Sequence, residues 1–220
     1  MTIEAVRPKG TGSIHDASGA RHARIWGFGG FRPERVVPNS ELVEAINSSD
    51  EWIQERSGIK SRRWAGPEDT VVSMSEAAAR DAVAAAGIEL SQVDAVIVST
   101  VTHPYQTPAA APIIADRLGL RCVAFDISAA CAGYCHGISL ANDMVRGGSA
   151  GFVLVIGVEK LSDFTDPTDR STAFIFADGA GAAVVGPSDT PGIGPTIWGS
   201  DGAQWETIKQ NESWLEVRDQ

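Results

Sequence analysis

One cysteine stands in a setting that could make its sulfur reactive. Cys131 lies in the segment 125–133 (FDISAACAG), where a stretch that favours a strand gives way to a helical pattern. Small neighbours such as Ala130 and Gly133 would let a substrate reach the sulfur and let the backbone turn sharply. A thiol at a helix N-terminus faces unpaired N–H groups and the positive end of the helix dipole, and both favour the reactive thiolate. The segment therefore predicts a nucleophile, whose amide could donate to the oxyanion of an attacked thioester.

The position of Cys131 also fits a buried core cysteine, because free cysteines are among the most buried residues. Cys122 and Cys135 lack the same setting: we expect Cys122 inside a strand and Cys135 one turn into a helix, both in the core. The cysteines do not form pairs with metal-ligand spacing, so no metal site is predicted. Their low, odd number favours a reducing compartment over a disulfide framework.

The elements that must hold Cys131 alternate between strands and helices. Apolar runs at 94–101, 122–127 and 152–158 predict strands, and the last of them (FVLVIGV) is typical of a central parallel strand. Helices are predicted over 40–46, 50–56, 73–86, 108–118 and 131–145, and further strand or hairpin segments over 24–31, 174–176 and 181–186. Strand, helix, strand, helix, strand in this order predicts an α/β fold with a parallel sheet and crossover helices.

Composition and charge narrow the setting further. Hydrophobic residues make up 43% of the 220 residues and charged residues 21%, both ordinary for a globular core. The net charge of -10 argues against nonspecific binding to nucleic acid or anionic membranes. Residues 1–23 lack the apolar run of a signal peptide, and the apolar stretches are too short to span a bilayer. We therefore expect a soluble, cytoplasmic protein without nucleic-acid or membrane partners.

Four motifs, in the same order, resemble one enzyme family. The turn at 130–133 (ACAG) after a Phe-Asp strand resembles the nucleophile turn of β-ketoacyl-acyl-carrier-protein synthase III. Residues 50–59 (DEWIQERSGI), 166–170 (DPTDR) and 176–182 (FADGAGA) resemble the "DEWI..R.GI", "DPTDR" and "FGDGAGA" segments of that family. The match runs from about Ile25 to about Gly202. The resemblance implies a thiolase-like fold, of which this chain would be the N-terminal lobe with a mixed, mostly parallel sheet.

The resemblance also implies substrate-binding residues. In the family, a tryptophan and an arginine sandwich the adenine of coenzyme A, and here they correspond to Trp52 and Arg170. Arg56 is similar to a phosphate-contacting arginine, Ser48 to a hydroxyl residue that touches coenzyme A, and Phe176 to a residue that lines the pantetheine tunnel. Stacking on an indole face and a guanidinium plane suits a purine. Taken alone, Trp52 and Phe176 would each fit a core aromatic, and Arg56 and Arg170 would fit solvated surface charges.

The loop 102–108 (THPYQTP) carries a further expectation. In the family this loop reaches across a homodimer and closes the acyl pocket of the partner subunit, and the residue before its proline sets the pocket depth. That residue resembles Thr107 here. Since some members have phenylalanine at this position and accept only short primers, we expect Thr107 to leave room for longer or branched acyl groups.

The family reaction implies the substrates and a missing part. The cysteine takes an acyl group from acyl-CoA, and malonyl-acyl carrier protein then condenses with it as carbon dioxide leaves, without a bound cofactor. A histidine and an asparagine in "HQAN"-like and "GNTSAAS"-like motifs support this step, and neither motif occurs in the sequence. We therefore expect a disordered extension at 1–22, a cysteine-bearing lobe at 23–202, and a connection at 203–220 toward an absent second lobe. The chain alone is expected to be inactive in condensation.

Two other functions fit the same residues. One is a secondary-metabolite priming or acyl-transfer enzyme of the same superfamily, which uses Cys131 without elongation. The other is a noncatalytic scaffold lobe that keeps only the fold. The release of carbon dioxide would distinguish the first alternative from the condensing enzyme, and the reactivity of Cys131 toward iodoacetamide would distinguish the second.

Overall fold

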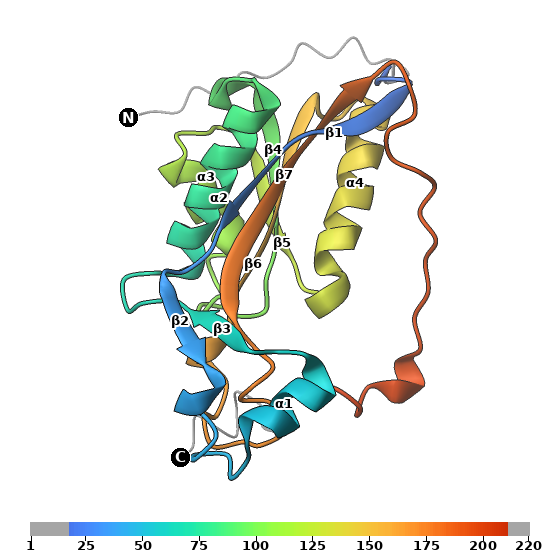
Figure 1. The fold of residues 1–220 in the computed structure, drawn as a ribbon. Coiled ribbons are helices and arrows are strands. Elements are labelled where there is room, and N and C mark those ends of the chain that lie inside the picture. Colours follow the sequence, from blue (N-terminus) through green and yellow to red (C-terminus); the bar gives the residue numbers. More distant parts are fainter. Residues whose placement is uncertain (1–17, 211–220) are drawn as a thin grey trace.

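A mixed five-stranded sheet forms the centre of the computed structural model, which describes residues 18–210 (Figure 1). In spatial order its strands are β1 (His22–Phe31), β7 (Asp178–Ser188), β6 (Phe152–Lys160), β4 (Val93–Ser99) and β5 (Val123–Ile127). β4 pairs in parallel with β5 and β6, whereas β7 pairs antiparallel with both β6 and β1. All strands of this sheet except β7 therefore run in the same direction. The predicted mixed, mostly parallel sheet is confirmed.

Helices cover both faces of this sheet. α2 (Val71–Ala86) and α3 (Ala110–Arg117) lie on one face, and α4 (Gly133–Gly147) lies on the other (Figure 1). The apolar residues of the central strands divide accordingly, because successive side chains of a strand point to opposite faces. Val96 and Val98 of β4 pack with α2 and α3, and Ala95 and Ile97 pack with α4. Because both faces of the central strands are covered by helices, the sequences of these strands are continuous apolar runs.

A smaller layer sits at one end of the sheet. It contains α1 (Asp50–Ser57) and a two-stranded sheet of β2 (Arg35–Pro38) and β3 (Ser61–Trp64). Its own apolar cluster is built from Val37, Leu42, Ile46, Ile53, Ala173 and Phe174, with Trp52 and Trp64 packed against it. Figure 1 shows this layer below the main sheet, beside the start of β7. It therefore lies at the end of the sheet where β4 and β6 finish.

Local capping explains where the predicted helices begin and end. Ser49 accepts a hydrogen bond from the amide of Trp52, and Gly58 ends α1 in the left-handed region at φ 72°. α2 begins at Val71 rather than at residue 73, because Thr70 and Ser73 form a reciprocal capping box. Gly87 ends α2 at φ 69°, as predicted.

Two local predictions were wrong. The helix predicted at 40–46 is a 3-10 turn at Asn39–Glu41 followed by further turns, and residues 174–176 form no strand, since 174 and 175 lie in a turn. The strand alternative at 181–186 is confirmed, because this segment belongs to one longer strand, β7, which pairs with both neighbours. β2 and β3 were missed, because each has only four residues and β3 is interrupted by two arginines.

The domain boundaries fall partly outside the described residues. Of the predicted extension 1–22, residues 1–17 lie outside the described part, while His22 already begins β1. Of the predicted connection 203–220, residues 211–220 lie outside as well. Within residues 18–210, none of the helices has the length and apolar character needed to cross a membrane.

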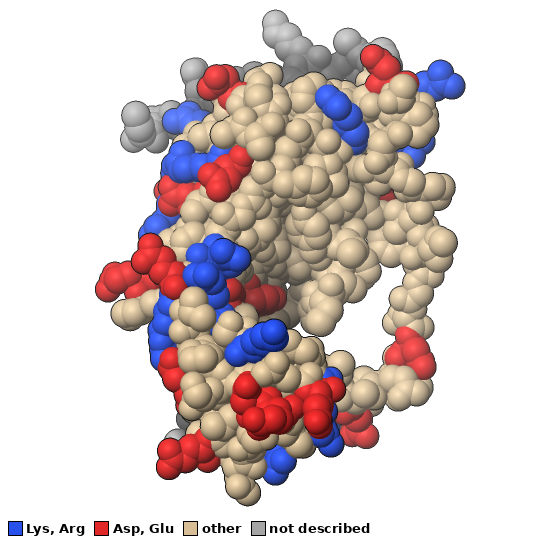
Figure 2. Space-filling view, viewed as in Figure 1, with Lys and Arg blue, Asp and Glu red and all other residues tan. Residues whose placement is uncertain are grey.

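Charged side chains gather over α2 and the small layer, whereas the α4 side of the face in Figure 2 carries few.

Candidate functional site: an exposed cysteine and an arginine-flanked tryptophan

Cys131 sits in a tight turn between β5 and α4. β5 ends at Ile127, residues Ala130–Ala132 form a 3-10 turn, and α4 starts only at Gly133. Ala130 adopts the left-handed region at φ 42°, which is unusual for a residue with a side chain and is found where a turn must be sharp. The thiol is exposed. The predicted strand-to-helix turn is therefore present, and the alternative of a buried core cysteine is wrong.

An open cavity of about 400 Å³ borders this turn. Ala130 and Tyr134 line it from the cysteine side, and Glu159 and residues 177–181 line it from the ends of β6 and β7. Burial, and more weakly the neighbouring Cys135, raise the pKa of the Tyr134 phenol. The cavity lies at the carboxyl ends of the parallel strands β4 and β6, which is the usual place for ligands in α/β sheets. The neighbour of Cys131, Ala130, therefore lines a cavity at the strand ends, whereas Cys131 itself is not one of its lining residues.

Glu159 is a site residue that the sequence analysis missed. Its carboxylate accepts hydrogen bonds from the Val101 amide at 3.0 and 3.2 Å, from the Thr102 hydroxyl at 2.6 Å and from the Thr100 hydroxyl at 3.4 Å. Burial raises the pKa of Glu159, and these hydrogen bonds oppose the shift. Glu159 thus ties β6 to the start of the loop that carries Thr107. A single acidic residue at the end of an apolar run was the only sequence signal.

Two glycines let α4 approach the sheet. A Cβ on Gly133 would lie 2.0 Å from the Ser99 hydroxyl oxygen, and a Cβ on Gly137 would lie 2.7 Å from a methyl carbon of Val155. The first turn of α4 therefore contacts β4 and β6 directly. This contact fixes the position of the Cys131 turn relative to the strand ends.

The other cysteines differ from expectation. Cys135 is exposed rather than part of the core, because the side of α4 that carries it does not face the sheet. Cys122 precedes β5 rather than lying inside it, but it is half-buried and packs against the main apolar cluster, in agreement with the expected core position. Burial, and secondarily Asp94, raise the pKa of the Cys122 thiol. Exposure alone therefore does not distinguish Cys131 from Cys135.

A second cluster surrounds Trp52. The guanidinium carbon of Arg56 lies 4.4 Å from the centre of the Trp52 ring, and that of Arg170 lies 4.7 Å from it. Phe174 meets the same ring edge-on, with centroids 5.4 Å apart and planes at 81°. The structure thus brings together Trp52 and Arg56 of α1 with Arg170 of a distant loop. These are three of the residues that the sequence analysis assigned to nucleotide binding.

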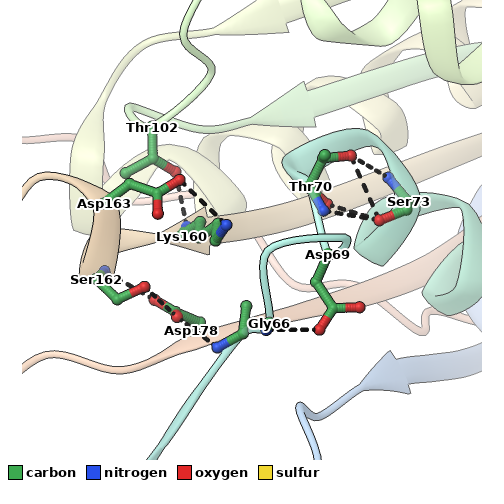
Figure 3. A network of polar contacts seen from close by, with 10 residues as sticks. Gly66, Asp69, Thr70, Ser73, Thr102, Lys160, Ser162, Asp163 and Asp178 are labelled. Atoms are coloured by element: carbon green, nitrogen blue, oxygen red, sulfur yellow. Dashed lines mark hydrogen bonds and ion pairs between the residues drawn. The ribbon is translucent and has the colours of Figure 1, made fainter.

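The loop that carries Arg170 is held at its start by Asp178 of β7. The Asp178 carboxylate accepts hydrogen bonds from the amide and hydroxyl of Ser162 at 2.9 and 2.6 Å, and from the Ala65 amide at 2.7 Å. Figure 3 shows Ser162 and Asp178 facing each other, next to the turn that carries Gly66 and Asp69. Asp178 therefore connects the loop to the end of β3.

The middle of the same loop is shaped by its own aspartates. Asp166 accepts hydrogen bonds from the amide and hydroxyl of Thr168, and Asp169 accepts from Ser171 and from the Thr172 hydroxyl. These hydrogen bonds lower the pKa of both carboxyl groups. The Asp-Pro-Thr-Asp-Arg segment is thus a pair of side-chain-capped turns that presents Arg170 at its end.

The remaining predicted residues lie in different surroundings. The Ser48 hydroxyl is buried and has no hydrogen-bond partner among the described residues. Phe176 lines a separate cavity of about 180 Å³ with Trp64 and Ala173. Thr107 is exposed and precedes Pro108, whose carbonyl lies 3.2 Å from Nε2 of His103. Since the geometry does not link these three residues to the Trp52 cluster, their roles stay predictions.

Comparison with known proteins extends these observations. A sequence model of the 3-Oxoacyl-[acyl-carrier-protein (ACP)] synthase III family matches residues 125–202. The chain is 61% identical over 206 residues to Beta-ketoacyl-[acyl-carrier-protein] synthase III 1 of Streptomyces coelicolor, covering 93% of this chain and 60% of that protein. It is 52% identical to the mycobacterial enzyme of Mycolicibacterium paratuberculosis, covering 94% of this chain and 62% of that protein.

Solved structures agree with the sequence comparison. The priming β-ketosynthase of the R1128 polyketide biosynthetic pathway has a TM-score of 0.91 and 44% identity, over 94% of this chain and 63% of that chain. The 3-oxoacyl-(acyl carrier protein) synthase III of Pseudomonas aeruginosa PAO1 has a TM-score of 0.80 and 37% identity, over 89% and 62%. The fold is therefore thiolase-like. Over more than nine tenths of its length the chain is similar to β-ketoacyl-[acyl-carrier-protein] synthase III proteins, and it spans about 60% of the length of the curated relatives it matches.

Proposed function

We propose that the protein carrying this sequence starts fatty acid synthesis by joining an acyl group to a malonyl unit. In the first step the Cys131 thiolate attacks the carbonyl carbon of an acyl-CoA, and the coenzyme A thiolate leaves as the acyl-cysteine forms. In the second step malonyl-acyl carrier protein loses carbon dioxide and its carbanion takes the acyl group from Cys131. The observation that carries the proposal is the exposed Cys131 in a strained turn beside an open cavity.

The Trp52 cluster supports coenzyme A as the acyl donor. A purine between Trp52 and Arg170 needs about 7 Å between the two planes, twice the optimal separation of about 3.5 Å for nonbonded carbon atoms. The observed 4.7 Å leaves no room for it. The Arg170 guanidinium therefore has to move away from the indole when the nucleotide enters, and the exposed position of Arg170 permits this movement.

Condensation is proposed to need groups beyond these 220 residues. The resemblance assigns decarboxylation to a histidine and an asparagine in motifs that the sequence does not contain. Its four histidines are His15, His22, His103 and His136, and the ring of His136 lies 5.2 Å from that of Trp198. We therefore expect the isolated chain to accept an acyl group slowly and to release no carbon dioxide from malonyl-acyl carrier protein.

Alkylation with iodoacetamide at neutral pH tests the role of Cys131. We expect Cys131 to react faster than Cys135, which is also exposed, and we expect acyl-CoA to protect Cys131 alone. Mass spectrometry of the peptides that contain each cysteine measures both rates. Equal, slow alkylation of the two thiols without protection would instead favour the noncatalytic scaffold.

A second candidate function is priming in a secondary-metabolite pathway. It is favoured by the similarity to the priming β-ketosynthase of the R1128 polyketide pathway, at 44% identity. An enzyme of this type that only transfers acyl groups would move the acyl group from Cys131 to an acceptor without release of carbon dioxide. Measured release of carbon dioxide from malonyl-acyl carrier protein, with the complete catalytic machinery present, favours the condensing enzyme.

Acyl-chain selectivity is proposed to depend on Thr107. The loop that carries Thr107 is anchored by Glu159 at its start and by the His103–Pro108 contact within it. A threonine fills less of an acyl pocket than a phenylalanine does, so longer or branched primers should fit. Thr107→Phe should shift the preference toward acetyl-CoA in a chain-length competition assay, and unchanged selectivity would contradict this role.

A cytoplasmic homodimer is also part of the proposal. The loop residues Val101 and Tyr105 are 48% and 65% exposed, and Val123 on the edge strand β5 is 57% exposed. Apolar side chains at a sheet edge and on a neighbouring loop are suited to contact with a second subunit. Light scattering coupled to gel filtration should give twice the chain mass, and a concentration-independent monomer would argue against the dimer.

A further inference from the structure

Arg62 is a buried cation in the small layer. It lies on β3 and is 5% exposed. Its guanidinium donates to the carbonyl of Val37 at 3.1 Å, to the side-chain oxygen of Asn39 at 2.6 Å and to the carbonyl of Phe174 at 3.1 Å. Burial lowers the pKa of Arg62, and the more distant Glu41 opposes the shift. A buried charge that donates to neutral oxygens is costly to desolvate, and the Nε of Arg62 is buried without a hydrogen-bond partner among the described residues.

Asn39 extends this contact to both ends of α1. Its side-chain amide donates to Asp50, the first residue of α1, at 2.6 Å. The same amide donates to the carbonyl of Ile59, which follows the glycine that ends α1, at 2.8 Å. Asn39 therefore contacts both ends of the helix that carries Trp52. Asn39 is itself held by Arg62, from which its side-chain oxygen accepts a hydrogen bond.

Arg62 also holds the far end of the Arg170 loop. That loop is fixed at its start where Asp178 accepts hydrogen bonds from Ser162, and its middle is held by its own turns. Near its end, the carbonyl of Phe174 accepts from Arg62 while the ring of Phe174 packs on Trp52. The two segments that form the Trp52 cluster therefore meet at one guanidinium.

We propose that Arg62 is a positioning residue that fixes α1 against the loop that carries Arg170 and so sets the separation of Trp52 from the backbone of that loop, while the Arg170 side chain stays free to move. The inference rests on the proposed function in one respect, because it takes the ligand whose affinity depends on this separation to be the nucleotide end of coenzyme A. Lysine is a poor substitute, because a single ammonium on a flexible stem does not reproduce the planar fork that reaches three acceptors. Arg62→Lys should therefore leave the cluster loose without removing any residue that touches ligand.

Fluorine NMR of protein labelled with 5-fluorotryptophan tests the geometry directly. The Trp52 resonance is assigned with Trp52→Phe and compared between wild type and Arg62→Lys, well below the unfolding temperature of both. We expect a shifted or broadened Trp52 signal in Arg62→Lys and an unchanged Trp205 signal. An unchanged Trp52 signal in a folded variant would overturn the proposal, whether or not coenzyme A binds.

Titration calorimetry with two probes tests the consequence. Coenzyme A carries the nucleotide, and 4′-phosphopantetheine does not. Arg62→Lys should weaken coenzyme A binding at least about tenfold, as expected for a lost hydrogen bond of a charged group, and should leave 4′-phosphopantetheine binding unchanged. Equal weakening of both probes would indicate a merely structural role and would overturn the proposal. Failure of the wild type to bind coenzyme A would instead count against the proposed function.

Arg63→Lys is the matched control. Arg63 lies on the same strand and also donates to backbone carbonyls, those of Pro33 and Glu34 at 2.9 and 3.0 Å. It should leave the Trp52 signal and both affinities unchanged.

A milder variant covers the case in which Arg62→Lys does not fold. Asp50→Ala removes the exposed end of the chain of contacts from Arg62 through Asn39, and Glu51→Ala removes a neighbouring first-turn carboxylate without touching it. We expect Asp50→Ala, but not Glu51→Ala, to shift the Trp52 signal and to weaken coenzyme A binding selectively. Equal effects of the two variants would contradict the proposal.

Discussion

The guanidinium of Arg170 lies over the indole of Trp52, with 4.7 Å between the guanidinium carbon and the ring centre. Arg170→Ala removes this cation and should weaken coenzyme A binding by about 0.5–2 kcal/mol, the range of a cation–π contact. Arg35→Ala provides the control, because Arg35 lies over Trp64 at 5.3 Å in a comparable pair outside the cluster. Calorimetry should show weaker binding only for Arg170→Ala. Equal affinities of the two variants would mean that Arg170 does not contact the ligand.

The close approach of α4 to β4 predicts a coupled pair of substitutions. Gly133→Ala should destabilise the fold by roughly 1–3 kcal/mol, because the added methyl group meets the Ser99 hydroxyl at 2.0 Å. Ser99→Ala should recover part of this loss, since it removes the nearer of the two contacted Ser99 atoms. Denaturant unfolding of the two single variants and the double variant measures the coupling.

Gly147→Ala is the control on the same helix. Nothing lies within 4 Å of the position that a Cβ would take on Gly147, so the substitution should stabilise α4 by up to about 1 kcal/mol through helix propensity alone. Strict additivity of Gly133→Ala and Ser99→Ala would show that the helix and strand do not make the close contact described.

The raised pKa of Glu159 predicts a pH-dependent stability. Burial makes the folded state bind the Glu159 proton more tightly than the unfolded chain does. The resulting stabilisation is complete below the ordinary value of 4.5 and is lost as the pH rises through the raised folded pKa. Glu159→Gln abolishes this titration, so its free energy of unfolding minus that of wild type should increase between about pH 4 and pH 8. A difference that stays constant, or falls, over this interval would contradict the assignment.

The hydrogen bonds of Asp126 to the start of α3 predict that removing its carboxylate destabilises the fold. Ala109, before α3, has no capping side chain, and the Asp126 carboxylate of β5 instead accepts from the amides of Ala110 and Ala111 at 2.8 Å each. Asp126→Ala should cost about 1–2 kcal/mol, as for loss of an N-cap. Ser49→Ala, which removes the local cap of α1, should cost a similar amount. Thermal unfolding compares the two, and a neutral Asp126→Ala would show that the long-range cap does not matter.

The sequence predicted the elements that depend on local signals. The strand runs at 94–101 and 152–158 and the helix stopped by Gly87 were correct because apolar periodicity and a left-handed C-cap determine them. The placement of β7 between β1 and β6 was not predictable, since an antiparallel strand between distant partners depends on pairing rather than on local pattern. For the same reason the four-residue strands β2 and β3 were missed.

The candidate site was predictable where a motif carried it. Cys131, Trp52, Arg56 and Arg170 followed from the turn and from the family segments, and the structure brings the last three together. The supporting residues Glu159, Asp178 and Arg62 were not predictable, because each acts through partners that lie far away in sequence. The exposure of Cys135 was wrongly predicted, since helical position alone does not say which side of a helix is covered.

Intact-protein and peptide mass spectrometry after incubation with an acyl-CoA tests the central claim most directly. We expect one acyl group to be added and to map to the Cys131 thiol. Cys131→Ala should abolish this acylation, whereas Cys135→Ser should retain it. Hydroxylamine should remove the group, as it does from a thioester. Acylation that persists in Cys131→Ala, or that maps to Cys135, would contradict the assignment of Cys131 as the nucleophile.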